Sequence, residues 1–296
     1  MRIVIADQME EEVVDEIRKL GQVDYKPSDV KKALVDADVL IVRSATKVTK
    51  ELVSDATKLR VVARAGVGLD NVDQQACKDK KIKVLNTPGA SSNAVAELAL
   101  GLIMSMMRNV QKAHHQMKNG KWDKKNLIGS EVAGKTLGVV GYGRIGSMLG
   151  KKAQALGMSI IAYNPPPRIT VEGIEYIEDI ADLFSKADII SLHVPATNET
   201  KNLINKQNIA KMKDGVFIVN TSRGEIIDED ALYEGCKSGK IAGAALDVFC
   251  NEPYTGRLLE LENVCFTPHL GASTKEAQVR IGQELVALLQ AELNVD

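Results

Sequence analysis

The chain has 296 residues, of which 45% are hydrophobic and 26% are charged, and its formal net charge is -1. This length is sufficient for two domains, and the composition is typical of a soluble globular protein. A net charge close to zero provides no long-range field of either sign, so we do not expect nucleic acid as a partner. The first residues turn acidic within a few positions, unlike a secretory signal, and the expected location is the cytoplasm.

The first part of the chain, up to about residue 88, repeats one pattern. Short apolar runs rich in valine and isoleucine, at residues 3–6, 39–42, 61–63 and 83–85, alternate with polar stretches that have helical spacing. Runs of this kind are typical of strands buried on both faces, and intervening helices connect the strands of a parallel sheet. We therefore predict an α/β unit with helices on both faces of its sheet.

Residues 94–107 form the most apolar stretch of the sequence. A membrane-spanning helix needs about 20 apolar residues, whereas this run contains Glu97 and ends at Arg108. A buried helix that links two domains is the better interpretation. Its helical spacing continues to Lys118 before Asn119 and Gly120 stop it. We expect no membrane as a partner.

A second series of strand-length apolar runs follows, at residues 137–140, 160–162, 189–192, 216–219, 244–246 and 264–266. These runs predict a second parallel α/β unit, and residues 274–293 have the spacing of an amphipathic helix that is free to pack on the first unit. The predicted fold is therefore of the α/β class, with two doubly wound parallel-sheet domains.

A glycine motif stands between the predicted strand at residues 136–140 and the helix that follows it. Gly141, Gly143 and Gly146 have GxGxxG spacing, which allows a tight turn, a close approach of the backbone to a diphosphate, and close packing of helix on strand. The diphosphate then lies at the helix N-terminus, where unpaired N–H groups point at it. Glycine clusters also make ordinary turns. Here, the preceding strand and the following helix favour a dinucleotide site in a Rossmann domain.

The residue expected to contact the ribose is Asn164. A carboxylate about 20 residues after the glycine motif normally binds the ribose hydroxyls of NAD. An amide can still bind the 2′-hydroxyl, but it does not repel the 2′-phosphate of NADP, and Arg168 is close enough in sequence to bind one. The sequence thus predicts a nicotinamide dinucleotide and favours NAD, with NADP not excluded.

Three polar residues follow strands of the second unit, at the sheet edge where such sheets carry their chemistry: Arg223, Glu252 and His269. Each also has an ordinary structural explanation: Arg223 as a solvated loop charge, Glu252 as an acid at a helix start, and His269 as a histidine in a turn. Because all three lie on separate loops at one sheet edge, they can converge on a single pocket.

The four cysteines, Cys77, Cys236, Cys250 and Cys265, are scattered without CxxC spacing. This pattern indicates neither a zinc site nor a disulfide framework. The adjacent pair His114 and His115 point to different faces of a helix, so we do not expect them to share a metal ion. The expected metal content is none.

Further stretches match these motifs to one family. Residues 43–49, 64–73 and 86–89, taken with the glycine motif and the three polar loops, resemble the D-isomer-specific 2-hydroxyacid dehydrogenases. The resemblance is closest to the branch that acts on D-3-phosphoglycerate, in a short form without the regulatory extension of longer members. It implies NAD-dependent hydride transfer to or from a small hydroxy acid, with His269 as acid/base, Glu252 as its partner and Arg223 as the cation that grips and polarises a carbonyl. It also implies a role in serine biosynthesis and a homodimer formed through the nucleotide-binding domain.

The resemblance also implies how the domains and the site are divided. It assigns residues 1–92 with 274–296 to a flavodoxin-like substrate domain, and residues 93–273 to the Rossmann NAD-binding domain. Beyond the glycine motif, it assigns these residues to the cofactor: Arg144, Ile145, Asn164, Val194, Pro195, Thr221, Asp247, Gly271 and Ala272. It places the backbone of Val67 and Gly68 at the substrate carboxylate. Arg43 and Arg64 each end an apolar run, and we expect them to bind a substrate phosphate, although both also suit solvated loop charges.

Other activities remain open at this point. A glyoxylate/hydroxypyruvate reductase or a D-lactate dehydrogenase fits the same motifs. A formate dehydrogenase fits less well, because formate oxidation takes no proton from oxygen and does not need a glutamate beside the histidine. Outside the enzymes, NAD(H)-sensing corepressors use the same fold and bind protein partners. They typically carry added flexible tails, which this sequence does not show.

Overall fold

The computed structural model describes residues 1–164 and 171–293. Two compact units make up the chain. The first contains Met1–Ser92 together with Ala272–Asp296, and the second contains Asn93–Gly271. Each unit has its own parallel sheet and its own buried core.

The first unit is built on a five-stranded parallel sheet with the order β2-β1-β3-β4-β5. Its strands are β1 (Arg2–Ile5), β2 (Gln22–Tyr25), β3 (Val39–Val42), β4 (Val61–Arg64) and β5 (Lys83–Asn86). Strand β3 is fully buried because it lies between β1 and β4 and carries only valine, leucine and isoleucine. The edge strands β2 and β5 are the more polar and more exposed ones.

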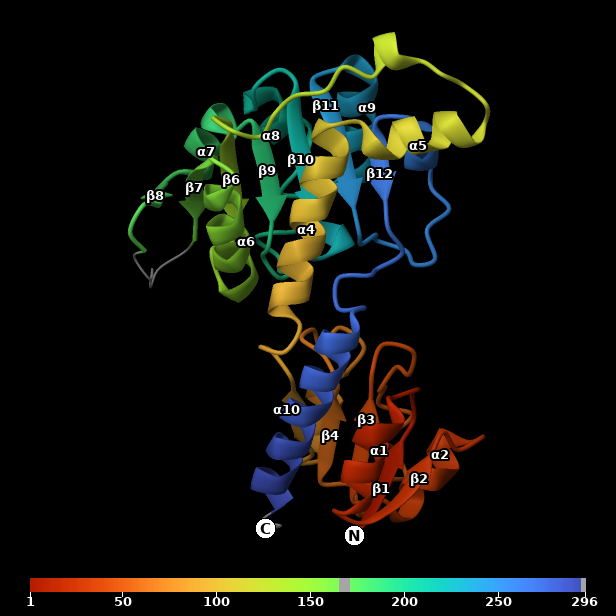
Figure 1. Cartoon of the computed structure of the whole chain (residues 1–296). Coiled ribbons are helices and arrows are strands. Elements are labelled where there is room, and N and C mark those ends of the chain that lie inside the picture. Colours follow the sequence, from red (N-terminus) through yellow and green to blue (C-terminus); the bar gives the residue numbers. More distant parts are fainter. Residues whose placement is uncertain (165–170, 294–296) are drawn as a thin grey trace. The chain divides into compact units, whose positions relative to one another are not determined.

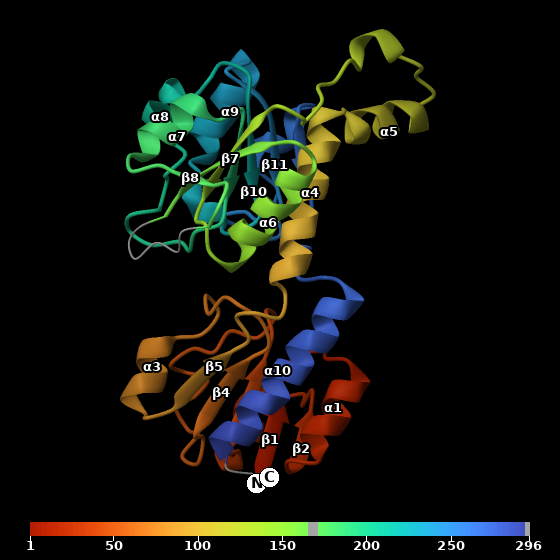
Figure 2. The same cartoon turned by 60° about the vertical axis from the view of Figure 1, so that its left-hand side comes forward.

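The helices of the first unit are α1 (Glu11–Arg18), α2 (Val30–Ala33), α3 (Gln74–Asp79) and α10 (Lys275–Leu293). Helices α1 and α10 lie side by side on one face of the sheet (Figure 2). A Cβ on Gly282 of α10 would overlap the side chain of Val13 in α1, so the close approach of the two helices requires glycine there. Helix α10 is thus part of the core of the first unit.

The second unit contains a seven-stranded parallel sheet with the order β12-β11-β10-β9-β6-β7-β8, seen edge to edge in Figure 1. Its strands are β6 (Thr136–Val140), β7 (Ser159–Tyr163), β8 (Glu175–Tyr176), β9 (Ile189–Leu192), β10 (Val216–Asn220), β11 (Ile241–Leu246) and β12 (Val264–Phe266). The chain runs from β6 outward to β8, then crosses back to β9 and continues to β12. The strand order therefore reverses between β6 and β9, which is where sheets of this kind bind ligands.

The helices of the second unit are α4 (Ser92–Met107), α5 (Val110–Lys118), α6 (Arg144–Ala155), α7 (Ile180–Lys186), α8 (Lys206–Lys211) and α9 (Glu229–Ser238). The expected continuous helix up to Lys118 is wrong, because α4 ends at Met107. Asn109 then has a left-handed backbone, with φ 54°, and α5 starts after it. Within the described residues no helix is both long and apolar enough to cross a bilayer.

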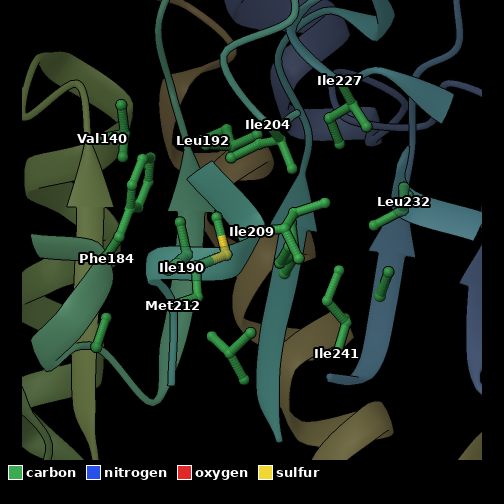
Figure 3. Packing of buried hydrophobic residues seen from close by; sticks show 14 of the residues in the cluster. Val140, Phe184, Ile190, Leu192, Ile204, Ile209, Met212, Ile227, Leu232 and Ile241 are labelled. Atoms are coloured by element: carbon green, nitrogen blue, oxygen red, sulfur yellow. The ribbon is translucent and has the colours of Figure 1, made fainter. Parts of the chain in front are cut away.

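The larger sheet is buried on both faces. Figure 3 shows one layer, in which Phe184 of α7 and Ile209 of α8 pack against Ile190 and Leu192 of β9. On the opposite face, α4 and α6 cover alternate residues of the same strands. Both faces are filled with side chains, so the carboxyl edge of the sheet is where polar groups gather. The predicted architecture of two parallel α/β sheets is confirmed.

Candidate active site

A row of residues runs along the carboxyl edge of the larger sheet. Val140, Leu192, Asn220, Leu246 and Phe266 are neighbours in register, and each is the last residue of its strand. The residues that follow them directly are Gly141, His193, Thr221, Asp247 and Thr267. Because the strand ends are neighbours in register, these five positions follow one another along the same edge. The fold thus assembles a polar row from five separate segments.

The glycine motif lies at one end of this row. Gly141 has φ +96°, and a Cβ on it would lie 2.5 Å from the carbonyl oxygen of His193. A Cβ on Gly146 would overlap the carbonyl of Gly141, so this glycine allows α6 to pack close to the turn. Gly143 differs from both, because it is exposed and nothing lies within 4 Å of the position of its Cβ. The fold itself does not require a glycine at Gly143.

Helix α6 begins at Arg144, directly after Gly143, which has no side chain to cap it. The unpaired N–H groups of this first turn therefore face open space, where a diphosphate binds favourably. Arg144 is exposed and Ile145 is partly buried beside it. The empty space at Gly143 and the uncapped helix start fit a dinucleotide.

The other expected cofactor residues follow neighbouring strands. Asn164 follows β7 directly, and Val194 and Pro195 lie two and three residues beyond the end of β9. Gly271 belongs to the second unit, whereas Ala272 begins the last segment of the first. The three prolines after Asn164, and Arg168, lie outside the described residues.

His269 and Glu252 are in direct contact. Nδ1 of His269 lies 2.9 Å from Oε2 of Glu252, and the other oxygen, Oε1, accepts a hydrogen bond of 3.1 Å from the backbone N–H of Phe249. The side chains of His269 and Glu252 are 50% and 38% exposed, so a small molecule can reach the pair. The contact at Nδ1 leaves Nε2 of the ring for an external partner.

Arg223 lies on a loop that packs beside the Glu252 loop. It follows β10, and its Nη1 donates a hydrogen bond of 2.5 Å to the carbonyl of Ser222. A Cβ on the next residue, Gly224, would overlap the backbone of Phe249. The two loops can therefore touch only because Gly224 has no side chain, and this contact holds Arg223 and Glu252 on adjacent segments.

Two buried polar atoms in the row have no hydrogen-bond partner among the described residues. One is Oγ1 of Thr221, and the other is Nδ1 of His193, whose Nε2 lies 2.8 Å from Oγ of Ser191. Burial lowers the pKa of His193 to about 4, so its ring is neutral at physiological pH. Unused hydrogen-bonding capacity at a buried edge is costly without a partner, which indicates that a polar ligand binds here.

A cavity of about 530 Å³ borders the His269–Glu252 pair. Its wall includes Phe249, Tyr254 and Phe266, whose rings stack with centroids 4.4 to 6.5 Å apart. Most of its surface is therefore apolar, and the pair supplies its ionisable groups. Among the described residues, no three His, Cys, Asp or Glu side chains are grouped so that they could hold a metal ion.

In the first unit, the expected substrate residues have well-defined neighbours. Gly66 has φ +147°, and a Cβ on it would overlap the guanidinium of Arg64, which therefore lies over this glycine. Asn86 donates a hydrogen bond of 2.6 Å to the carbonyl of Val67, which fixes the loop that continues into Gly68. Arg64 and the Val67–Gly68 backbone thus form one cationic loop.

Arg43 has a different environment. Its Nη1 donates a hydrogen bond of 3.1 Å to the carbonyl of Gln8, and its Nη2 donates to Oε1 of Gln278 in α10. Its own backbone N–H donates to Asp7 at 2.6 Å. Arg43 therefore joins three segments of the first unit.

Comparisons with known proteins agree with this geometry. Residues 100–271 match the family model described as D-isomer specific 2-hydroxyacid dehydrogenase, NAD binding domain. The chain is also 53% identical to a hydroxypyruvate reductase of Thermotoga maritima, over 90% of this chain and 88% of that protein.

The chain belongs to the D-isomer specific 2-hydroxyacid dehydrogenase family. It is also 46% identical to a D-3-phosphoglycerate dehydrogenase of Methanocaldococcus jannaschii, over 99% of this chain but only 58% of that protein. Among solved structures, a D-lactate dehydrogenase of Aquifex aeolicus complexed with NAD and lactic acid matches with a TM-score of 0.86. The two chains are 30% identical, and the match covers 99% of this chain and 96% of the other.

NAD is the cofactor of this dehydrogenase family, and the residues present fit it. Gly143 and the start of α6 suit its diphosphate, and the two unpaired atoms of Thr221 and His193 suit its polar groups. The sequence resemblance implies Thr221 as a cofactor residue but does not include His193 or Thr267. Both could have been found by the same signal, because each directly follows a buried strand whose end is in register with Asn220 or Leu246.

Proposed function

We propose that this dehydrogenase interconverts D-3-phosphoglycerate and 3-phosphohydroxypyruvate with NAD(H), an oxidation that belongs to serine biosynthesis. The observation that carries the proposal is the 2.9 Å contact between His269 Nδ1 and Glu252 Oε2 on the edge that also bears the glycine motif. A fixed imidazole beside a dinucleotide site is what the removal of a hydride and a proton from one alcohol requires.

In the direction of oxidation, His269 accepts the proton of the substrate hydroxyl at Nε2. Glu252 stabilises the resulting imidazolium through Nδ1 and keeps the ring in one orientation. NAD, when bound, supplies the acceptor for the hydride that leaves C2 of the substrate. In the reverse direction, the imidazolium returns the proton to the carbonyl oxygen.

Arg223 and the Arg64 loop account for the negative charge of the substrate. A guanidinium is always charged and forms paired hydrogen bonds with carboxylate and carbonyl oxygens, so Arg223 suits a carbonyl that is about to accept a hydride. We assign the substrate carboxylate to the backbone of Val67 and Gly68, and the phosphate to Arg64, whose guanidinium lies over Gly66.

One observation favours hydroxypyruvate as a second candidate substrate. The guanidinium of Arg43 already donates to Gln8 and Gln278, so it is less available for a phosphate than the sequence indicates. The Thermotoga maritima relative that the chain matches over most of both lengths is named a hydroxypyruvate reductase. An unphosphorylated acid would need only the Arg64 loop and Arg223.

The deciding experiment compares kcat/KM for 3-phosphohydroxypyruvate, hydroxypyruvate and glyoxylate with NADH as the donor. The proposal expects phosphohydroxypyruvate to be the best substrate by at least about tenfold, because a phosphate adds nearly two charges for cations to bind. Equal or better turnover of the unphosphorylated acids contradicts the phosphate assignment and favours the second candidate. Tight NADH binding without turnover of any of them would favour the NAD(H)-sensing corepressor alternative instead.

We further propose that the chain forms a homodimer through its second unit. Four large apolar residues on α5 and the segment after it are exposed: Val110 by 56%, Met117 by 53%, Trp122 by 81% and Ile128 by 85%. Their concentration on one segment of the chain favours an interface there. Light scattering should give twice the mass of one chain for the wild type, and the mass of one chain for Trp122→Glu/Ile128→Glu. Leu156→Glu, at another exposed position, should remain a dimer.

A further inference from the structure

The loop that carries His269 is hydrogen-bonded almost entirely to one residue, Asp247. The backbone carbonyl of Asp247 accepts a bond of 2.9 Å from the N–H of His269. Its Oδ1 accepts a bond of 2.7 Å from the N–H of Leu270, and its Oδ2 accepts one of 2.9 Å from the N–H of Gly271. Three consecutive N–H groups therefore end on a single aspartate.

Thr267 adds a fourth bond to the same residue. Its hydroxyl donates to Oδ1 of Asp247 at 2.6 Å, while its own N–H donates to the carbonyl of Leu246 at 3.0 Å. Pro268 has no N–H to satisfy. Asp247 is only 1% exposed, and a buried carboxylate is stable only if donors surround it. The three donors to its side chain meet this requirement.

These bonds explain the unusual backbone of His269. Its φ is +55°, a left-handed backbone conformation that residues with a Cβ rarely adopt. Such a conformation persists only where the surroundings enforce it. The N–H groups of Leu270 and Gly271, which both donate to the carboxylate, together with the bond from the N–H of His269 to the Asp247 carbonyl, provide such enforcement. The direction of the imidazole ring, and hence its contact with Glu252 at 2.9 Å, depends on this backbone conformation.

We infer that Asp247, together with Thr267, is a positioning residue that holds the ring of His269 against Glu252. This inference rests on the proposed role of His269 as the acid/base. It differs from the contact with the nicotinamide side that the sequence resemblance implies for Asp247. A residue that only binds cofactor would affect the affinity for NADH, whereas a residue that positions His269 affects turnover at saturating NADH.

Thr267 provides the matched test, because it lies next to the carboxylate and its substitution leaves Asp247 in place. In Thr267→Val, we expect kcat to fall about tenfold, and in Asp247→Asn by on the order of 100-fold, because small displacements of a catalytic group have effects of this size. The Kd of NADH, measured by fluorescence titration, should stay within about threefold of the wild type in Thr267→Val. Thr267→Ser keeps the hydroxyl and should restore kcat.

The pH profile separates positioning from a general loss of stability. If Thr267→Val loosens the ring from Glu252, the midpoint of its kcat–pH curve should shift in the same direction as that of Glu252→Gln, while Thr267→Ser keeps the wild-type midpoint. Normal kcat and an unshifted midpoint in Thr267→Val overturn the inference. The inference is also overturned if Asp247→Asn weakens NADH binding but leaves kcat at saturating NADH unchanged.

A separate control addresses the proposed function itself. His269→Ala should abolish most turnover whatever the role of Asp247. If His269→Ala stays active, the proposed function fails. If His269→Ala is inactive but Thr267→Val and Thr267→Ser behave alike, only the positioning inference fails.

Discussion

The carbonyl oxygen of His193 lies 2.5 Å from the position that a Cβ on Gly141 would occupy. The end of β9 is therefore packed directly against the first glycine of the cofactor motif. His193 also donates its N–H to the carbonyl of Val140 at 2.7 Å, so the two strand ends are tied together where the strand order reverses. Any side chain at Gly141 would force these strand ends apart.

This contact predicts different effects for two glycines of one motif. Gly141→Ala should lower the melting temperature by several degrees, because its Cβ would overlap backbone and its φ of +96° is unfavourable for alanine. Gly143→Ala should leave the melting temperature unchanged and weaken NADH binding, because its Cβ enters only the space assigned to the diphosphate. Thermal unfolding and NADH titration on both variants check this. Normal NADH affinity in Gly143→Ala would contradict the assigned cofactor site.

Substitution of His269 or Glu252, the proposed catalytic pair, should affect turnover more than cofactor binding. We expect His269→Ala to reduce kcat by about 10²–10⁴-fold with NADH affinity preserved, because the proton loses its acceptor. Glu252→Gln should cause a smaller loss, since the amide can still contact Nδ1 but carries no charge. Steady-state kinetics in both directions provide the measurement, and near-normal turnover in His269→Ala would remove it from the mechanism.

Cofactor preference should depend on Asn164. An amide retains a partner for the ribose 2′-hydroxyl but lacks the charge that repels a 2′-phosphate. We therefore expect NAD to be preferred by a smaller margin than in a relative with an acid at this position, and Asn164→Asp should widen the margin. The ratio of kcat/KM values for NADH and NADPH measures it. If the wild type prefers NADPH, Arg168 rather than Asn164 decides the selectivity.

The two arginines of the first unit form a second matched pair. Arg64→Ala should raise KM for phosphohydroxypyruvate about tenfold or more, and much less for hydroxypyruvate, because only the first substrate carries a phosphate. Arg43→Ala should lower the melting temperature instead, since its guanidinium joins Gln8 to Gln278. Equal increases in KM for both substrates in Arg64→Ala would contradict its assignment to the phosphate.

His193 should make stability depend on pH in a defined window. Its pKa is lowered from 6.5 to about 4 in the folded state by burial, so between these values the unfolded chain binds a proton that the folded chain does not. The free energy of unfolding should therefore fall as the pH is lowered from 6.5 to 4.

Denaturant titrations of the wild type and His193→Asn across this range provide the measurement. Other groups titrate in both proteins, so the difference in unfolding free energy between them isolates the contribution of the histidine. This difference should diminish as the pH is lowered toward 4. Parallel curves would mean that the ring is not held neutral in the fold.

The sequence by itself determined the sheet architecture and the residue types of the candidate site. Strands β3 and β6 were predicted at Val39–Val42 and Thr136–Val140, because central parallel strands are buried on both faces and must be apolar throughout. Strands β2 and β8 were missed. They lie at sheet edges, where QVDY and EY carry little apolar signal and form strands only because a neighbour supplies hydrogen bonds.

Contacts between distant segments were decided only by the tertiary structure. No local pattern indicates that Arg43 donates to Gln278, 235 positions along the chain, or that Asp247 binds the N–H groups of Leu270 and Gly271. Periodicity and motifs report on residues within a few positions of one another, whereas these bonds arise when strand ends are brought side by side. The residue types at the site are therefore readable from the sequence, while the direction in which His269 points is set by the packing of the sheet edge.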